Sequence, residues 1–141
     1  MNRVLGLDVG SKTIGVAVTD ELGVAAHAVK TLQRKGTDAD VVQIAALART
    51  YATTRLVIGL PYDLEGNEGP RAKRVRVLVD ALADNGFTVE LQDERYSTVE
   101  AERALLEADL SRARRKQVVD VVAAQVILTA WLTRHPPRSG A

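Results

Sequence analysis

The amino-acid sequence predicts an α/β fold in which helices cover both faces of a mixed, five-stranded sheet. Three apolar segments rich in β-branched residues come first, at 4–9, 13–19 and 25–32, and only short turns separate them. Such spacing is typical of antiparallel strands joined by hairpins. The rest of the chain alternates helical and strand patterns, which indicates parallel β–α units that continue the same sheet.

The first helix should begin at residues 36–38, with Asp38 as its N-cap, because an Asp side chain accepts hydrogen bonds from the free N–H groups of a first turn. Its apolar side would carry Val41 and Ile44. The short apolar run at 55–60 then fits a strand that is buried on both faces within the parallel part of the sheet.

A loop rich in Gly and Pro at 61–70 leads to a helix over 71–85, which Gly86 ends as a C-cap residue. Residues 88–93 form the fifth strand. The chain then contains a helix that starts at the capping box Ser97-Thr98-Val99-Glu100, a basic linker at 111–116, and a last helix that ends before Pro136-Pro137.

Length and composition limit the kinds of protein this chain can be. Its 141 residues suit one domain with one core, which we place at residues 1–137, followed by a flexible tail at 138–141. The formal net charge of +1 gives no overall indication of a nucleic-acid partner, and the absence of cysteine excludes disulfides and thiolate metal sites. No signal peptide is visible, and the apolar stretch 118–132 is shorter than the ~20 residues of a membrane-spanning helix. We therefore expect a soluble, cytoplasmic protein.

Two acids stand where apolar residues are expected. Asp8 lies in the first strand, within the apolar segment 4–9, and a buried carboxylate costs several kcal/mol unless a partner compensates it. Asp120 shares one face of the last helix with Ala124 and Ile127, at about 100° per residue. Its expected place in the first two turns would lower the cost by only ~0.3–1 kcal/mol through the helix dipole. A core Asp that caps a nearby turn is the alternative for this residue.

A shared divalent cation would compensate both acids. Mg²⁺ or Mn²⁺ takes oxygen ligands and replaces the repulsion between carboxylates with attraction to a common charge. Glu94 directly follows the fifth strand and could complete the cluster. Strand ends in an open α/β sheet are also where ligands generally bind. The sequence thus predicts a metal site formed by Asp8, Glu94 and Asp120, on condition that the topology brings them together.

Four groups of motif residues follow one another along the chain. They are Leu5-Gly6-Leu7-Asp8-Val9-Gly10 with Lys12 to Ala17, Gly59-Leu60-Pro61 with Gly66 and Glu68-Gly69-Pro70, Asp93-Glu94-Arg95 with Ser97-Thr98, and Lys116 followed by Asp120 with Ala123-Ala124. In this order and at this chain length, nearly the whole sequence resembles the YqgF/RuvX family, a branch of the RNase H-like nuclease superfamily.

The resemblance implies an RNase H-like sheet in strand order 3-2-1-4-5, with Asp8, Glu94 and Asp120 as the catalytic acids and metal ligands. It implies two ions, Mg²⁺ or Mn²⁺, which would activate a water and stabilise the leaving oxygen without a protein nucleophile.

Cationic side chains near these acids would contact the phosphates of the substrate. We assign this role to Lys12, Arg71, Arg74, Arg95, Arg112, Arg114, Arg115 and Lys116. A plain turn lysine is the alternative for Lys12, and Arg95 could instead pair with a neighbouring acid. Lys73 and Arg76 are assigned to the solvated surface of their helix.

The resemblance implies a metal-dependent endonuclease that acts on structured nucleic acid, and we favour processing of the 5′ end of pre-16S rRNA. A Holliday junction resolvase is the alternative, and it would act as a homodimer because it cuts two symmetric strands. A non-catalytic nucleic-acid-binding module is a second alternative, against which the three acids argue. Actin-like ATPases and sugar kinases also open with a D-x-G hairpin, but they need two such domains. We expect no membrane partner and no small-molecule cofactor.

Overall fold

Five strands form one mixed sheet in the computed structural model, which describes residues 3–62, 65–93 and 112–135, and of residues 112–120 the backbone alone. The elements in chain order are β1 (Leu5–Val9), β2 (Thr13–Thr19), β3 (Ala26–Gln33), α1 (Thr37–Thr50), β4 (Arg55–Leu60), α2 (Pro70–Asp84), β5 (Thr88–Asp93) and α4 (Arg112–Arg134). The strand order β3-β2-β1-β4-β5 confirms the predicted order and the α/β class. Strands β2, β4 and β5 begin and end at the predicted residues.

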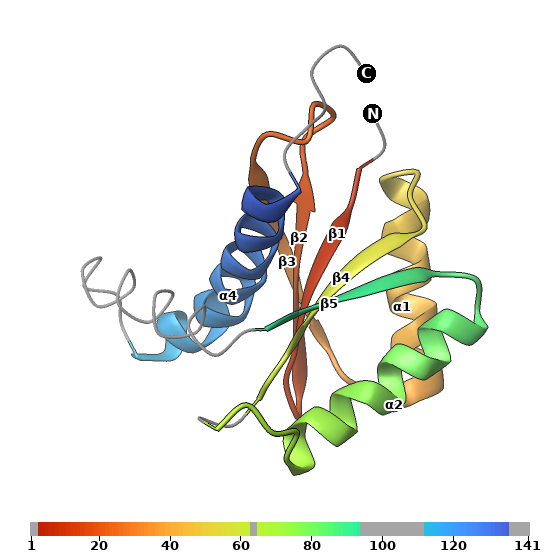
Figure 1. Ribbon diagram of the computed structural model, residues 1–141, viewed down its shortest axis with the longest axis vertical. Coiled ribbons are helices and arrows are strands. Elements are labelled where there is room, and N and C mark those ends of the chain that lie inside the picture. Colours follow the sequence, from red (N-terminus) through yellow and green to blue (C-terminus); the bar gives the residue numbers. More distant parts are fainter. Residues whose placement is uncertain (1–2, 63–64, 94–111, 136–141) are drawn as a thin grey trace.

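Strand β1 occupies the centre of the sheet. It runs antiparallel to β2, with Leu7 opposite Val16, and parallel to β4, with Leu7 beside Ile58. Strand β4 in turn runs parallel to β5, and Leu60 pairs with Asp93 at the ends of these two strands. The C-terminal ends of β1, β4 and β5 therefore lie along one edge of the sheet, at the lower side of Figure 1 for β1.

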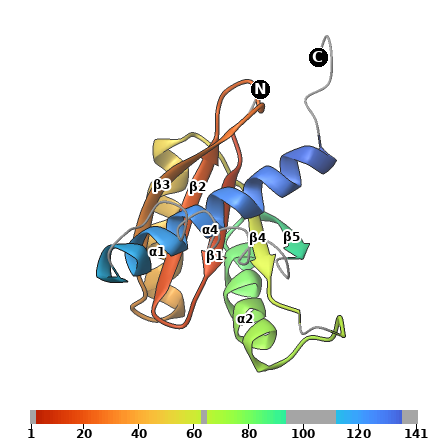
Figure 2. The same ribbon diagram turned by 90° about the vertical axis from the view of Figure 1, so that its left-hand side faces the viewer.

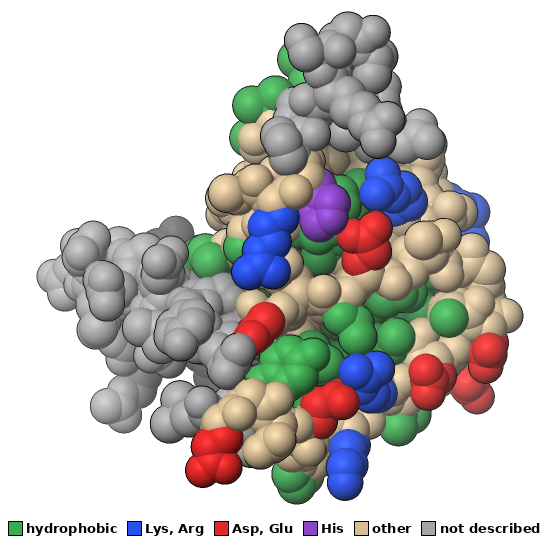
Figure 3. Space-filling view, viewed as in Figure 1, with side chains coloured by type: hydrophobic (Ala, Val, Ile, Leu, Met, Phe, Trp, Pro, Cys, Tyr) green, Lys and Arg blue, Asp and Glu red, His purple; other side chains and the backbone are tan. Residues whose placement is uncertain are grey.

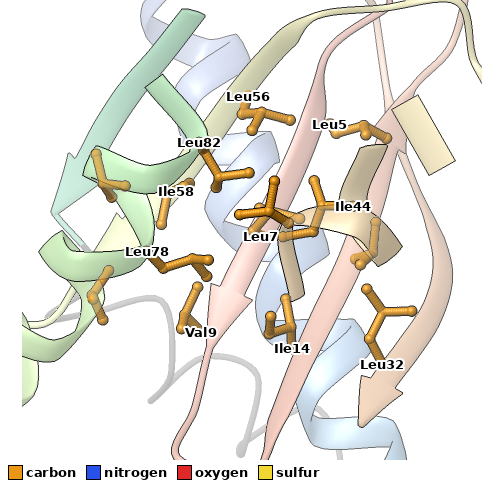
Figure 4. Close-up of a cluster of buried hydrophobic side chains, with 14 of the residues drawn as sticks. Leu5, Leu7, Val9, Ile14, Leu32, Ile44, Leu56, Ile58, Leu78 and Leu82 are labelled. Carbon is orange, nitrogen blue, oxygen red and sulfur yellow. The ribbon is translucent and has the colours of Figure 1, made fainter. Parts of the chain in front are cut away.

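The sheet separates two apolar layers, as Figures 1 and 2 show. Helices α1 and α2 cover one face, where Leu7 of β1 packs with Ile44 of α1 and Leu78 of α2 (Figure 4). Helix α4 covers the other face and buries Leu128 against Val4 and the strands around it. Helices on both faces of the sheet were predicted from the sequence.

Gly6 allows α4 to approach β1 closely. A Cβ at this position would lie 2.9 Å from the Cβ of Leu128 and 3.3 Å from the carbonyl oxygen of Ala124. Real Cβ contacts are essentially never as short as the first of these distances, so a larger residue would displace the helix. Helix α4 runs in the opposite sense to β1, since Trp131 lies beside Val4 at the start of the strand whereas Ala124 lies beside Gly6.

Two details of the predicted elements are wrong. Helix α1 begins at Thr37, so Asp38 lies inside its first turn, and the N-cap is Gly36, which has a φ of 106° and no side-chain cap. This left-handed conformation suits glycine and leaves no role for Asp38 as a cap. The basic residues at 112–116 are not a linker, because α4 already includes them. Arg and Lys are good helix formers, and a run of them does not interrupt a helix.

The other described helix ends agree with the sequence. Helix α2 ends at Asp84, and Gly86 follows with a φ of 91°, the conformation of a glycine C-cap residue. Helix α4 ends at Arg134, before the two prolines. None of the helices within the described ranges combines the length and hydropathy that a bilayer span requires.

We expect Gly6→Ala to lower the free energy of unfolding by about 1–3 kcal/mol, because the added methyl group overfills the contact between β1 and α4. Urea unfolding followed by circular dichroism measures this change. Gly69→Ala is the matched control, since Gly69 has a φ of −89° and a methyl group added there would have nothing within 4 Å. Its effect should stay below about 1 kcal/mol. Equal stability of both variants would contradict the close approach of α4.

Candidate active site

Asp8 is the acid that the central strand carries at its C-terminal end. Its neighbours Leu7 and Val9 pack on the α1 and α2 side of the sheet. Because side chains alternate along a strand, Asp8 and Gly6 belong to the opposite face, which α4 covers. Asp8 is partly buried and pairs across the ladder with Gly15 of β2. The strand ends one residue later, so the carboxylate lies at the rim of the sheet rather than in its middle.

The two other predicted catalytic acids have no described side chains. Strand β5 ends at Asp93, and Glu94 and Arg95 lie outside the described residues. Asp120 is part of α4, in its third turn rather than the first two, so the helix dipole offers it less relief than expected. Among the side chains that the structure describes, no group of three or more His, Cys, Asp and Glu residues could hold a metal ion.

The turn between β1 and β2 is held by backbone hydrogen bonds on both of its sides. The N–H of Gly10 donates to the carbonyl oxygen of Thr13 at 2.8 Å, which closes the hairpin. The N–H of Arg34, just after β3, donates to the carbonyl oxygen of Lys12 at 2.8 Å. The side chain of Lys12 is exposed on this turn, four residues after Asp8.

Arg34 and Asp40 form a buried pair behind this turn, and the sequence reasoning missed both residues. Asp40 is fully buried and accepts two hydrogen bonds at 2.9 Å, from Nε of Arg34 and from the backbone N–H of Lys35. Nη1 of Arg34 donates to the carbonyl oxygen of Gly10 at 3.0 Å. Asp40 shares a helix face with Ile44, four residues later, so an acid on an apolar face was the signal that could have identified it.

Arg71 and Arg74 do gather with the hairpin turn. They line a small hollow of about 40 Å³ together with Gly10, Ser11 and Arg34. Lys73 is exposed on the same helix but does not line this hollow. The structure describes only the helical backbone, and not the side chains, of the basic residues Arg112, Arg114, Arg115 and Lys116.

Arg76 has a different environment from Arg71 and Arg74. Its guanidinium forms an ion pair with Glu68, which belongs to the loop before α2. The hydrogen bond to Glu68 raises the pKa of Arg76, so it stays charged at any ordinary pH. Arg76 therefore holds this loop against the helix. The prediction of a solvated surface residue did not include this ion pair.

The opposite end of the sheet has other features. A hollow of about 670 Å³ lies where α1 ends and β4 begins, and apolar residues such as Val41, Ala48 and Phe87 line it. On the β5 edge, Nε1 of Trp131 donates to Oε2 of Glu90 at 2.6 Å. Figure 3 shows acidic, basic and histidine side chains side by side on the face that includes this edge. Of the predicted site residues whose side chains the structure describes, none lines this large hollow.

Two curated bacterial proteins are similar to this chain along nearly its whole length. One, from Myxococcus xanthus, is 53% identical over 136 residues, which cover 96% of this chain and 90% of that protein. Another, from Symbiobacterium thermophilum, is 48% identical over 141 residues, covering 97% and 98% of the two chains. Both carry the name "Putative pre-16S rRNA nuclease".

Among solved structures, T. thermophilus RuvC in complex with Holliday junction substrate has a TM-score of 0.60 and 16% sequence identity, with 96% of each chain covered. At this identity the likeness shows a shared fold, the RNase H-like sheet predicted above. A family model described as "RuvX: Holliday junction resolvase" matches residues 2–134. Because this model matches nearly the whole chain and the two relatives are 53% and 48% identical to it, the chain belongs to the RuvX family.

Proposed function

We propose that this chain is a metal-dependent nuclease that cleaves phosphodiester bonds beside the end of β1, with pre-16S rRNA as its substrate. Asp8 carries the proposal, because it is a partly buried carboxylate at the rim of the central strand, on the face that α4 covers. A role in the fold alone would not need an acid in an otherwise apolar strand. The names of the two curated relatives favour the ribosomal RNA substrate.

Asp120 is proposed as a partner of Asp8. From Gly6 to Asp8 the strand advances about 6.7 Å. From Ala124 back to Asp120 helix α4 advances about 6 Å. Gly6 faces the helix turn between Ala124 and Leu128, and α4 runs in the opposite sense to β1, so both steps lead from this contact in the same direction. The shared direction supports a position of Asp120 near the end of β1 at which Asp8 lies.

Glu94 is proposed as the third acid. It follows Asp93, which pairs with Leu60 where β4 and β5 both end. Since β1 is parallel to β4, the ends of all three strands share the edge at which Asp8 lies. This arrangement supports a contribution of Glu94 to the same site.

Two Mg²⁺ or Mn²⁺ ions are part of the proposal. When bound, they would supply a water that is activated at neutral pH and a positive charge for the leaving oxygen. The carboxylate oxygens of Asp8 are the hard ligands that these ions prefer, and the chain has no cysteine that would favour a softer metal. Asp8, Glu94 and Asp120 would hold the ions at the end of β1, where the phosphate to be cleaved would bind.

The cationic residues would orient the substrate strand. We propose phosphate contacts for Lys12, Arg71, Arg74, Arg95, Arg112, Arg114, Arg115 and Lys116. The exposed position of Lys12 on the turn after Asp8 supports such a contact, and so does the hollow shared by Arg71 and Arg74. The place of residues 112–116 in the first turns of α4, on the helix that also carries Asp120, supports the same role for the four basic residues of this stretch.

A Holliday junction resolvase is the second candidate function. The description of the matching family and the junction bound to the RuvC structure favour it. Such an enzyme would need a homodimer, because two symmetric strands are cut. Parallel cleavage assays on a pre-16S rRNA fragment and on a four-way DNA junction, combined with analytical ultracentrifugation, distinguish the two substrates.

We expect Asp8→Asn to lower the rate of Mg²⁺-dependent cleavage at least about a hundredfold, or about 2.7 kcal/mol in the activation barrier. Asparagine keeps the shape of the side chain but removes the charge that would hold the ion. Cleavage of a 5′-labelled pre-16S rRNA fragment, with Mn²⁺ as a second metal and EDTA as a blank, measures the effect.

Asp84→Asn is the matched control, since Asp84 is an exposed acid at the far end of α2. It should cleave at the wild-type rate. If Asp8→Asn cleaves as fast as this control, or EDTA has no effect, the metal-dependent mechanism is wrong. If neither substrate is cut by the wild type but RNA is bound, the protein is a non-catalytic binding module.

We also expect Mg²⁺ or Mn²⁺ to raise the melting temperature of the wild type by a few degrees, on the order of 3 °C per kcal/mol of binding free energy. Without metal, the neighbouring carboxylates repel one another, so Asp8→Asn should melt higher than the wild type in EDTA. Differential scanning fluorimetry measures both shifts. A lower melting temperature of Asp8→Asn in EDTA would instead indicate that Asp8 is held by hydrogen bonds as a structural residue.

A further inference from the structure

We propose that the hollow beside the β1–β2 turn is a subsite for one backbone phosphate next to the cleaved bond, and that Asp40 is the positioning residue that prepares it. Arg34, Arg71 and Arg74 line this hollow with the turn residues Gly10 and Ser11. The assignment to nucleic acid rests on the proposed nuclease function, but the subsite itself rests on the geometry of these residues.

The hollow has the size and charge for a phosphate group. Its volume of about 40 Å³ is a few times the ~10–15 Å³ that a cavity needs to hold one water, so it suits a small group such as a phosphate rather than a base. Among the described residues, all of the charged side chains that line it are arginines. The guanidinium group is planar and offers several N–H donors in a fixed geometry that matches phosphate oxygens.

Arg71 and Arg74 supply the net positive charge of this subsite. They lie three residues apart on α2, so they share one face of the helix. The first turn of α2 contains no acidic residue. Arg76, two residues after Arg74, instead pairs with Glu68 and does not line the hollow.

Arg34 supplies geometry more than charge, because the fully buried carboxylate of Asp40 neutralises it. Two of its five N–H donors bind Asp40 and the carbonyl oxygen of Gly10. These bonds join α1, the residue after β3 and the β1–β2 turn into one rigid unit. Asp40 thereby fixes both the wall of the hollow and the turn that follows Asp8.

The hollow and Asp8 flank the same strand end. Val9 lines the hollow on the α2 side, whereas Asp8, one residue earlier, belongs to the α4 side. A strand that crosses this edge of the sheet with its reacting phosphate at Asp8 would bring a flanking phosphate to the arginines. At the lower end of Figure 1, the start of α2 lies beside the end of β1.

The salt dependence of binding tests this subsite. Binding of a fluorescein-labelled pre-16S rRNA hairpin is measured by anisotropy in EDTA, where no cleavage occurs, between about 50 and 200 mM salt. Each phosphate contact contributes about 0.7–0.9 to the slope of log K against log salt. Arg74→Gln should remove one contact. The factor by which RNA affinity falls between the lowest and the highest salt concentration should then be about threefold smaller than for the wild type.

Lys73→Gln is the matched control, because it removes the same charge from the same helix without touching the hollow. It should leave the slope at the wild-type value. Equal slopes for Arg74→Gln and Lys73→Gln would overturn the subsite. Inorganic phosphate at matched ionic strength should displace RNA from the wild type more than from Arg74→Gln. If phosphate raises the melting temperature but Arg74→Gln binds RNA normally, the hollow is a free-anion site and the assignment to RNA is wrong.

Asp40→Asn tests the positioning role by the sign of its effect. The substitution makes the protein more positive, so simple attraction predicts tighter RNA binding. Loss of Arg34 positioning predicts weaker binding and a smaller salt slope, which is the result we expect. Tighter binding would overturn the role of Asp40.

Arg34→Lys gives the same information if Asp40→Asn does not fold, since lysine keeps the charge but cannot form both hydrogen bonds. It should weaken binding and reduce the salt slope in a protein with a native circular dichroism spectrum, and an unchanged slope would contradict the proposal. All of these measurements are made without metal. Absence of cleavage by the wild type in Mg²⁺ would therefore overturn the nuclease function while leaving the subsite to be judged on binding alone.

Discussion

The position of β1 at the centre of the sheet is the constraint on which the other features depend. The strand is covered on both faces, and strict alternation assigns each of its side chains to one of two layers. Leu7 and Val9 fill the layer under α1 and α2, so Gly6 and Asp8 must face α4. Gly6 then lets α4 approach so closely that a Cβ at this position would displace the helix. A shift of one residue in the pairing with β2 or β4 would place a carboxylate in the larger core and a leucine at the rim.

The same alternation divides the end of β1 into two chemically different sides. Asp8 faces the layer of α4, and one residue later Val9 borders the hollow that Arg71 and Arg74 line. The turn that joins these sides is fixed from outside. Its backbone carbonyl at Gly10 is held by Arg34, which Asp40 fixes in turn. Breaking a buried ion pair of this kind leaves an uncompensated charge, which is costly, so the pair keeps the turn in one conformation.

The strands could be predicted from the sequence because each is a short apolar run bounded by turn residues, and three of them agree with the structure residue for residue. The order of the sheet came from the family resemblance and could not be derived from local patterns. The N-cap rule selects Asp38, although helical periodicity places Asp40 on the core face. The deciding contact, from Arg34 at the end of another element, is long-range, and a local rule cannot detect it. The charge of residues 112–116 suggests a linker, yet helix propensity does not penalise Arg or Lys.

A net charge of +1 cannot attract a polyanion over a distance, so the positive charge must act locally. The arginines that line the hollow lie on the other face of the sheet from Asp8, because Val9 borders the hollow and side chains alternate along β1. In the proposed site the acid and the arginines would therefore act on different parts of one substrate strand. The apolar residue between them is thus as necessary to the proposed site as the charged ones.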